Sequence, residues 1–120
     1  ATRFLKASFE GWIFCRDNFD ACVNDVLNNG PTLGEGHMRW MLNEINALIW
    51  PSPAGIGMLD AASFQQTVDI SVEFGVLSAA PDAGASRTDL AEAALAQMAD
   101  VDTTGASWQR MEIEVTPGGE

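Results

Sequence analysis

Apolar residues recur at intervals of three and four positions along most of the chain, which is the pattern of amphipathic α-helices. In the second such stretch, for example, Phe19, Cys22, Val23 and Val26 fall on one face. The pattern predicts five helices. They cover residues 2–16, 19–29, 35–49 and 61–74, and a last segment that Ser86 or Thr88 caps and that extends to Met98.

Residues that stop or cap helices mark several of these boundaries. Gly30-Pro31 and Pro51 are expected to end the second and third helices, and Gly75 the fourth. The carboxylate of Asp60 is well placed to cap the first turn of the fourth helix. The chain is therefore expected to be mostly α.

Residues 110–115, with the sequence RMEIEV, follow a different pattern. Their apolar side chains alternate with two glutamates, which predicts a short β-strand. The backbone groups of a strand need partners, and the sequence shows no second strand. We expect residues 110–115 to pair with the same residues of a second copy, as a homodimer, or with a sheet of a larger protein.

The composition fits a single unit spanning residues 1–120 and excludes several partners. Six basic residues stand against 17 acidic ones, and the arginines are scattered, so nucleic acid and anionic membrane surfaces are poor partners. The sequence contains no run of about 18 apolar residues, which is the length that a membrane-spanning helix needs. The chain does not begin with Met and lacks a signal-peptide pattern at its start, so we expect a mature or truncated product.

Cys15 and Cys22 lie seven positions apart. On one continuous helix they would be separated by about 10.5 Å along the axis, which is too far for a disulfide. A break at residues 16–18 would allow them to meet, but we expect two buried thiols. No CxxC motif or Cys/His cluster is found, so no metal site is predicted.

Cofactor and catalytic motifs are also not found. The Gly-x-Gly pairs at residues 34–36 and 55–57 lack the third glycine of a dinucleotide fingerprint and the lysine of a P-loop, so no cofactor is predicted. His37 has no nearby nucleophile, and we expect it to be a surface or capping residue.

The segment GHMRWMLNEINALIWPSPAGIG, residues 36–57, holds the candidate ligand-binding residues. Glu44 lies close to the apolar face of its helix, so its carboxylate needs a protein cation or a cationic ligand group. Asn43 both donates and accepts hydrogen bonds. Trp40 and Trp50 are either stacking platforms for a planar ligand or parts of the core.

That segment, together with FQQTVDISVEFGVL, RTDLAEAAL and the closing VTPGGE, resembles the C-terminal portion of ABC-transporter solute-binding proteins. The resemblance is to the group that binds nitrate, sulfonates and taurine, or precursors of the thiamine pyrimidine and of riboflavin. It extends over nearly the whole chain.

The resemblance implies a two-lobed type II periplasmic-binding-protein fold, of which residues 1–120 would form the helical C-terminal third. It implies a periplasmic protein without enzymatic activity that delivers a small solute to an ABC permease. Because half a cleft cannot enclose a ligand, we do not expect this segment to bind the solute alone. The alternatives are a stand-alone helical interaction module and an enzyme of pyrimidine-precursor synthesis.

Overall fold

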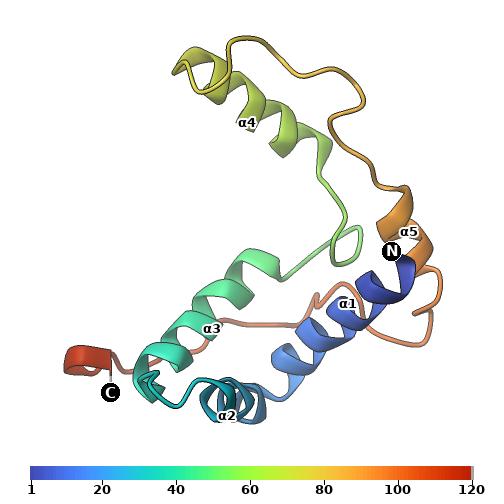
Figure 1. Cartoon of the computed structure of the whole chain (residues 1–120). Coiled ribbons are helices and arrows are strands. Elements are labelled where there is room, and N and C mark those ends of the chain that lie inside the picture. Colours follow the sequence, from blue (N-terminus) through green and yellow to red (C-terminus); the bar gives the residue numbers. More distant parts are fainter. Residues whose placement is uncertain (120) are drawn as a thin grey trace.

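The computed structural model describes residues 1–119 and, within them, contains five α-helices and no β-strand (Figure 1). The elements are α1 (Thr2–Asp17), α2 (Phe19–Asn29), α3 (Glu35–Ile49), α4 (Ala61–Glu73), α5 (Asp89–Leu95) and a short 3-10 turn, η1 (Pro117–Gly119). The prediction of a mostly helical chain is confirmed. The first four helices begin and end within one residue of the predicted bounds.

Two predicted elements differ from the structure. The last helix ends at Leu95, because hydrogen bonds such as Met98 N–H to the Leu95 carbonyl tighten the chain into a turn. Residues 110–115 follow an extended course (Figure 1), but they do not form a strand, since no second strand lies among the described residues. An alternating pattern favours an extended backbone, whereas a strand also requires a neighbouring strand.

One part of the core joins the first helix, α1, to the last, α5. Phe9 and Ile13 of α1 pack with Ala91 and Ala94 of α5, and Trp50 lies in the same cluster. The loop after α3 is hydrogen-bonded to the loop after α5, from Ser52 N–H to the Thr104 carbonyl (2.8 Å) and from Ile56 N–H to the Thr103 carbonyl (2.9 Å). The peptide bond between Trp50 and Pro51 is cis.

A second part of the core lies between α2 and α3, where Cys22 and Val23 contact Met38 and Leu42. Next to it, Cys15 and Cys22 form a disulfide with a Cα–Cα distance of 5.0 Å. The prediction of two buried, unpaired thiols is wrong. The break that the sequence indicated at residues 16–18 is present, since α1 ends at Asp17 and the backbone turns at Asn18 (φ −133°, ψ 59°) before α2 begins, and this turn brings the two sulfur atoms together.

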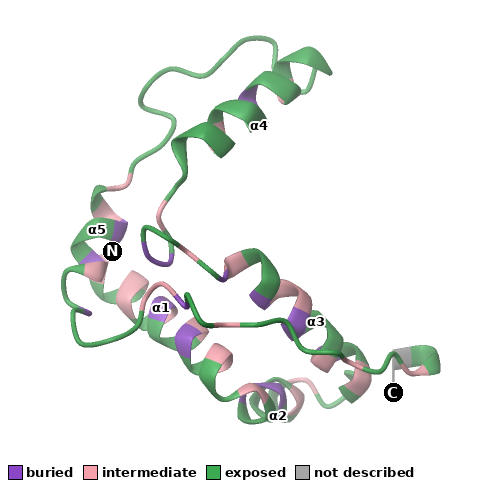
Figure 2. Cartoon of the chain, turned by 180° about the vertical axis from the view of Figure 1, so that it is seen from behind, coloured by how far each residue is buried: buried purple, intermediate pink, exposed green. Residues whose placement is uncertain are grey.

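Helix α4 projects away from the other helices (Figure 1). As predicted, Asp60 caps its first turn by accepting a hydrogen bond from the Ser63 N–H (2.7 Å). Val68 is buried on this helix, whereas most of its other residues are exposed (Figure 2). An exposed connection, residues 76–87, leads from α4 to α5.

The chain is expanded for its length. Its radius of gyration is 17.1 Å, whereas a compact domain of this length has about 14 Å. It exposes 8209 Å² of surface, while a compact protein of this mass exposes about 6,300 Å². The helices therefore surround much less core than 120 residues ordinarily enclose.

Candidate functional site

Helix α3 carries three of the four candidate residues on the side that faces residues 110–116, which we call the tail. The tail runs beside α3 in both views of the whole chain (Figures 1 and 2). A shallow hollow of about 440 Å³ lies between them and is lined by Trp40, Asn43 and Glu44 from α3 and by tail residues. The structure thus brings Trp40, Asn43 and Glu44 together, and it places Trp50 elsewhere.

Asn43 binds the tail through both polar atoms of its side chain. Its Nδ2 donates a hydrogen bond to the Met111 carbonyl (2.8 Å), and its Oδ1 accepts one from the Met111 N–H (3.0 Å). The side chain therefore bonds to Met111 as a neighbouring peptide group would in a sheet. Because Asn43 is only 2% exposed, leaving these atoms unpaired would be costly.

Glu44 forms an ion pair with Arg110 at the start of the tail. A protein cation thus meets the need for a partner that the sequence indicated. The chain has only six basic residues, so few candidates existed, but no spacing rule distinguished Arg110 from the others. Sequence reasoning therefore missed Arg110.

Trp40 is partly exposed and lies beside the ring of His37, with 6.0 Å between the ring centroids and 23° between their planes. A second hollow, of about 300 Å³, is lined by these two rings and by Val115 and Gly118, among other residues. His37 is exposed, as predicted. Within the described residues, no group of three His, Cys, Asp or Glu side chains could hold a metal ion.

Trp50 belongs to the core and lies beneath the guanidinium group of Arg16, whose Cζ is 4.6 Å from the ring centroid. Arg16 also binds Asp17 through two hydrogen bonds (2.7 and 3.0 Å) and the Asp102 carbonyl (2.9 Å). The Arg16 side chain is only 7% exposed. Hydrogen bonding to Asp17 raises the pKa of Arg16 above its ordinary value.

Asp102 organises the loop on which Arg16 rests. Its Oδ1 accepts hydrogen bonds from the Thr104 hydroxyl and from the N–H groups of Thr104 and Gly105, and its Oδ2 lies 3.3 Å from Arg16 Nη1. The hydrogen bond from the Thr104 hydroxyl, followed by those from the two N–H groups and by the charge of Arg16, lowers the pKa of Asp102.

Two buried polar atoms near the end of α3 have no hydrogen-bond partner among residues 1–119. They are Asn46 Oδ1 and Trp50 Nε1, an acceptor and a donor that belong to residues four positions apart. Most buried polar atoms in proteins are paired. The apolar periodicity of the sequence did not predict that either atom would be buried without a hydrogen-bond partner.

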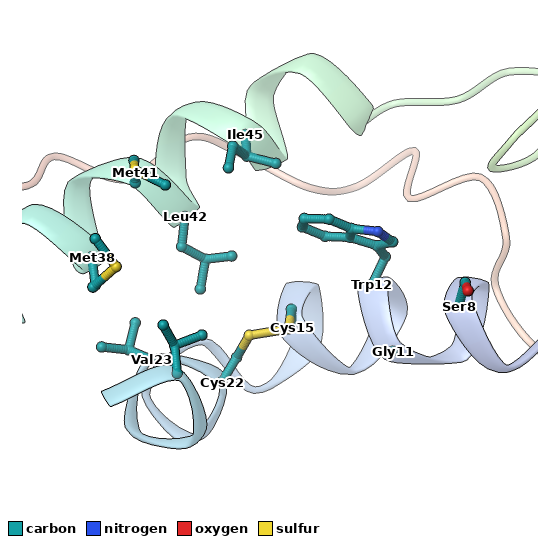
Figure 3. Close-up of a pocket in the computed structure, with 11 residues that line it drawn as sticks. Ser8, Gly11, Trp12, Cys15, Cys22, Val23, Met38, Met41, Leu42 and Ile45 are labelled. Carbon is teal, nitrogen blue, oxygen red and sulfur yellow. A yellow bond between two sulfur atoms is a disulfide. The ribbon is translucent and has the colours of Figure 1, made fainter. Parts of the chain in front are cut away.

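An apolar groove forms on a different side of α3, between it, α1 and α2 (Figure 3). It holds about 390 Å³ and has the disulfide in one wall. Trp12 and Ile45 line one part of it, and Met38 and Val23 another. Most of the residues that line the groove are apolar. The groove can therefore receive apolar side chains, but it offers few hydrogen-bonding groups to orient a polar solute.

In comparisons with known proteins, no family model, no curated protein and no solved structure matches this chain. Among the described residues, no helix is both long enough and apolar enough to cross a membrane.

Proposed function

We propose that this chain is part of the solute-binding component of an ABC importer, and that the whole component binds a small polar or heterocyclic solute. The candidates are a sulfonate, nitrate, or a pyrimidine or flavin precursor. The observation that carries this proposal is the resemblance of residues 36–57 and of the segments that follow them to such proteins. On this proposal the protein performs no chemistry and delivers its solute to a membrane permease.

The expanded shape supports the proposal. The chain exposes about 1,900 Å² more than a compact protein of its mass, including large apolar side chains such as Phe4 and Leu48, which is 88% exposed. A segment that packs against the remainder of a two-lobed protein is expected to have such surfaces when taken alone. The groove of Figure 3 would then be filled by apolar residues of that remainder.

The disulfide between Cys15 and Cys22 supports the proposed location. Disulfides persist in oxidising compartments such as the bacterial periplasm and are rare in the cytosol of most organisms. A periplasmic solute-binding protein meets this condition.

The contacts within the chain limit which residues are free to touch a solute. Asn43 and Glu44 are engaged with the tail, and Trp50 is covered by Arg16. Trp40, which is 39% exposed and lines both hollows beside the tail, is the candidate that remains partly accessible. We therefore propose Trp40 as the solute contact on this chain, with the other contacts supplied by the rest of the protein.

A thermal-shift screen of the whole protein that contains this chain tests the proposal. Taurine, nitrate, an aminopyrimidine and a flavin are compared at concentrations from micromolar to millimolar. A ligand that binds only the native state raises the free energy of unfolding by about 2.7 kcal/mol at 100 times its Kd. A rise in Tm with one class supports the proposal, and unchanged Tm values with all four contradict it.

The second candidate function is a stand-alone helical interaction module. The observation that favours it is the extended, exposed tail, whose backbone is only partly hydrogen-bonded. Size-exclusion chromatography with light scattering on the 120-residue chain distinguishes the two functions. A monodisperse species with cooperative melting favours the module, whereas aggregation or a broad, non-cooperative transition favours a segment of a larger protein.

A further inference from the structure

The tail is fixed to α3 along one of its two backbone edges. Both backbone groups of Met111 are hydrogen-bonded to the buried side chain of Asn43. The ion pair between Arg110 and Glu44 holds the start of the tail in place, and Val115 lies at its other end in the hollow beside His37 and Trp40. The extended shape therefore exists before any partner arrives, which lowers the entropy cost of binding.

The opposite edge of the tail is free at Arg110, Glu112 and Glu114. In an extended chain, the backbone groups of successive residues point alternately to the two sides. Because Met111 points towards α3, the N–H and C=O groups of Arg110, Glu112 and Glu114 point away from it. These groups make no hydrogen bond to any other described residue, and all three residues are exposed.

No strand of this chain occupies that edge, since the structure has none within residues 1–119. Such a row of unpaired N–H and C=O groups is a template for strand addition by another polypeptide. The charges beside the edge indicate what kind of strand fits. Glu112 and Glu114 stand on one face of the tail, and opposite charges stabilise a cross-strand pair whereas like charges destabilise it.

The same charges disfavour a second copy as the partner. In an antiparallel pair of tails, the register that places Arg110 opposite Glu114 also places Glu112 directly opposite Glu112 of the other copy. Shifting the register by two residues in one direction places Glu112 opposite Glu114 instead. Shifting it in the other direction pairs Arg110 with Glu112, but only residues 110–112 of the two tails then face each other. Every arrangement that keeps the apolar side chains on a common face and pairs most of the tail thus sets glutamate against glutamate.

We propose that the free edge of the tail adds, as a β-strand, to an extended segment of a different protein, and that this segment carries Lys or Arg at alternate positions facing Glu112 and Glu114. Main-chain hydrogen bonds from Arg110, Glu112 and Glu114 supply the binding, and the two glutamates select a basic sequence. This proposal goes beyond the proposed transport function and does not depend on it.

The first test uses a synthetic peptide with blocked ends, Thr-Lys-Val-Lys-Val-Lys-Thr, and amide hydrogen exchange on the unmodified 120-residue chain. We expect the peptide to slow exchange at Arg110, Glu112 and Glu114 while Met111, which is already bonded, changes little. A peptide with Glu in place of each Lys should bind at least about tenfold more weakly, which corresponds to 1.4 kcal/mol. Equal binding of the two peptides, or no protection at these three amides, contradicts the proposal.

The second test uses proline, which removes a backbone donor at one position. Glu112→Pro removes both an N–H of the free edge and the Glu112 carboxylate, and it should weaken binding of the lysine peptide by at least about tenfold. Ile113→Pro is the matched control, because that N–H lies on the edge that faces α3 and bonds to no other residue in the described part of the chain; it should change binding by less than about threefold. Equal losses in both variants contradict the assigned edge.

Two further measurements identify the source of the strand. If light scattering shows a dimer of the unmodified chain that Glu112→Pro dissociates, the partner is a second copy and the proposal is wrong. If the lysine peptide protects the 120-residue chain but not the whole protein that contains it, the edge is filled within that protein, and the proposal of a separate protein fails. Protection in both, with a monomeric chain, is the expected result.

Discussion

At the scale of single residues, the polar side chains of α3 bind other parts of the same chain. Asn43 and Glu44 hold the tail, and their partners are 66 or more positions away in the sequence. The sequence correctly indicated that Glu44 needed a cation, because a carboxylate beside an apolar face must be paired. It did not predict the partner of Asn43, since a backbone amide leaves no signature in the sequence.

Replacing Asn43 should release the tail from α3. Asn43→Ala removes both hydrogen bonds to Met111 and leaves the Met111 N–H and C=O groups without these partners, so we expect a loss of about 1–3 kcal/mol in the free energy of unfolding. Urea denaturation measures this loss, and the exchange rate of the Met111 amide reports release of the tail directly. Asn28→Ala, an exposed asparagine of α2, is the control. An unchanged Met111 exchange rate in Asn43→Ala would contradict this role.

The stability of the loop at residues 102–105, which Arg16 contacts, should depend on pH through Asp102. Its pKa is lowered in the folded protein, so the ionised form stabilises the fold. That stabilisation is present above the ordinary aspartate pKa of about 3.9 and is lost as the pH falls through the lower, folded value. Melting curves between neutral and acidic pH should show a smaller acid-induced decrease in Asp102→Asn than in the unmodified chain. Equal decreases in the two proteins would contradict this contribution.

Gly105 lies against Trp50 in a conformation that disfavours a side chain. Its φ is +58°, and an added Cβ would lie 2.6 Å from Cε3 of Trp50. Gly105→Ala should therefore cost about 1–2 kcal/mol for the backbone and about 1–3 kcal/mol more for overpacking. Gly75→Ala is the matched control: its φ is +72°, but no atom lies within 4 Å. Urea denaturation should show the larger loss for Gly105→Ala, and equal losses would mean that the contact with Trp50 is unimportant.

At the scale of elements, the sequence predicted the helices well, but it did not predict the disulfide or the partner of residues 110–115. Apolar periodicity, the Asp60 cap and the stop at Pro51 are local signals, so the bounds of α1 to α4 followed from them. The sequence indicated the break at residues 16–18, but it did not indicate the direction in which the backbone turns at Asn18, and the disulfide depends on that direction. The predicted strand at 110–115 failed for a related reason, because its partner turned out to be a side chain of α3.

The disulfide should stabilise the junction between α1 and α2. Closing a loop of this length is expected to contribute about 2–3 kcal/mol by restricting the unfolded chain. Replacing both Cys15 and Cys22 by Ser should lower the free energy of unfolding by this amount in guanidinium denaturation. The unmodified chain in excess reductant is the control and should behave like the double variant. Identical stability with and without reductant would mean that the disulfide contributes nothing.

At the scale of the whole molecule, the helices form an open arrangement with extents of 44 × 39 × 27 Å. α1, α2, α3 and α5 share contacts, while α4 projects from them (Figure 1). The sequence suggested a segment of a larger protein only through its resemblance to solute-binding proteins, because the periodicity of individual helices does not specify how they are arranged. The excess exposed surface is therefore information that the structure adds.

Small-angle X-ray scattering on the isolated 120-residue chain tests this arrangement. We expect a radius of gyration close to the 17.1 Å of the structure and above the value of about 14 Å for a compact domain. A dilution series excludes self-association as the cause of a larger value. A concentration-independent radius near 14 Å would show that α4 folds back onto the other helices.

The contact between α1 and α5 has a consequence for cleavage of the chain. The exposed connection at residues 76–87 is rich in Ala, Gly, Ser and Pro, and such segments are preferred sites of proteolysis. A cut there breaks the covalent link between α1–α4 and the segment that contains α5 and the tail. Yet α5 is packed against α1, and Met111 is bonded to Asn43. Noncovalent contacts thus hold the two fragments together, and a nicked protein should migrate as one species until it is denatured.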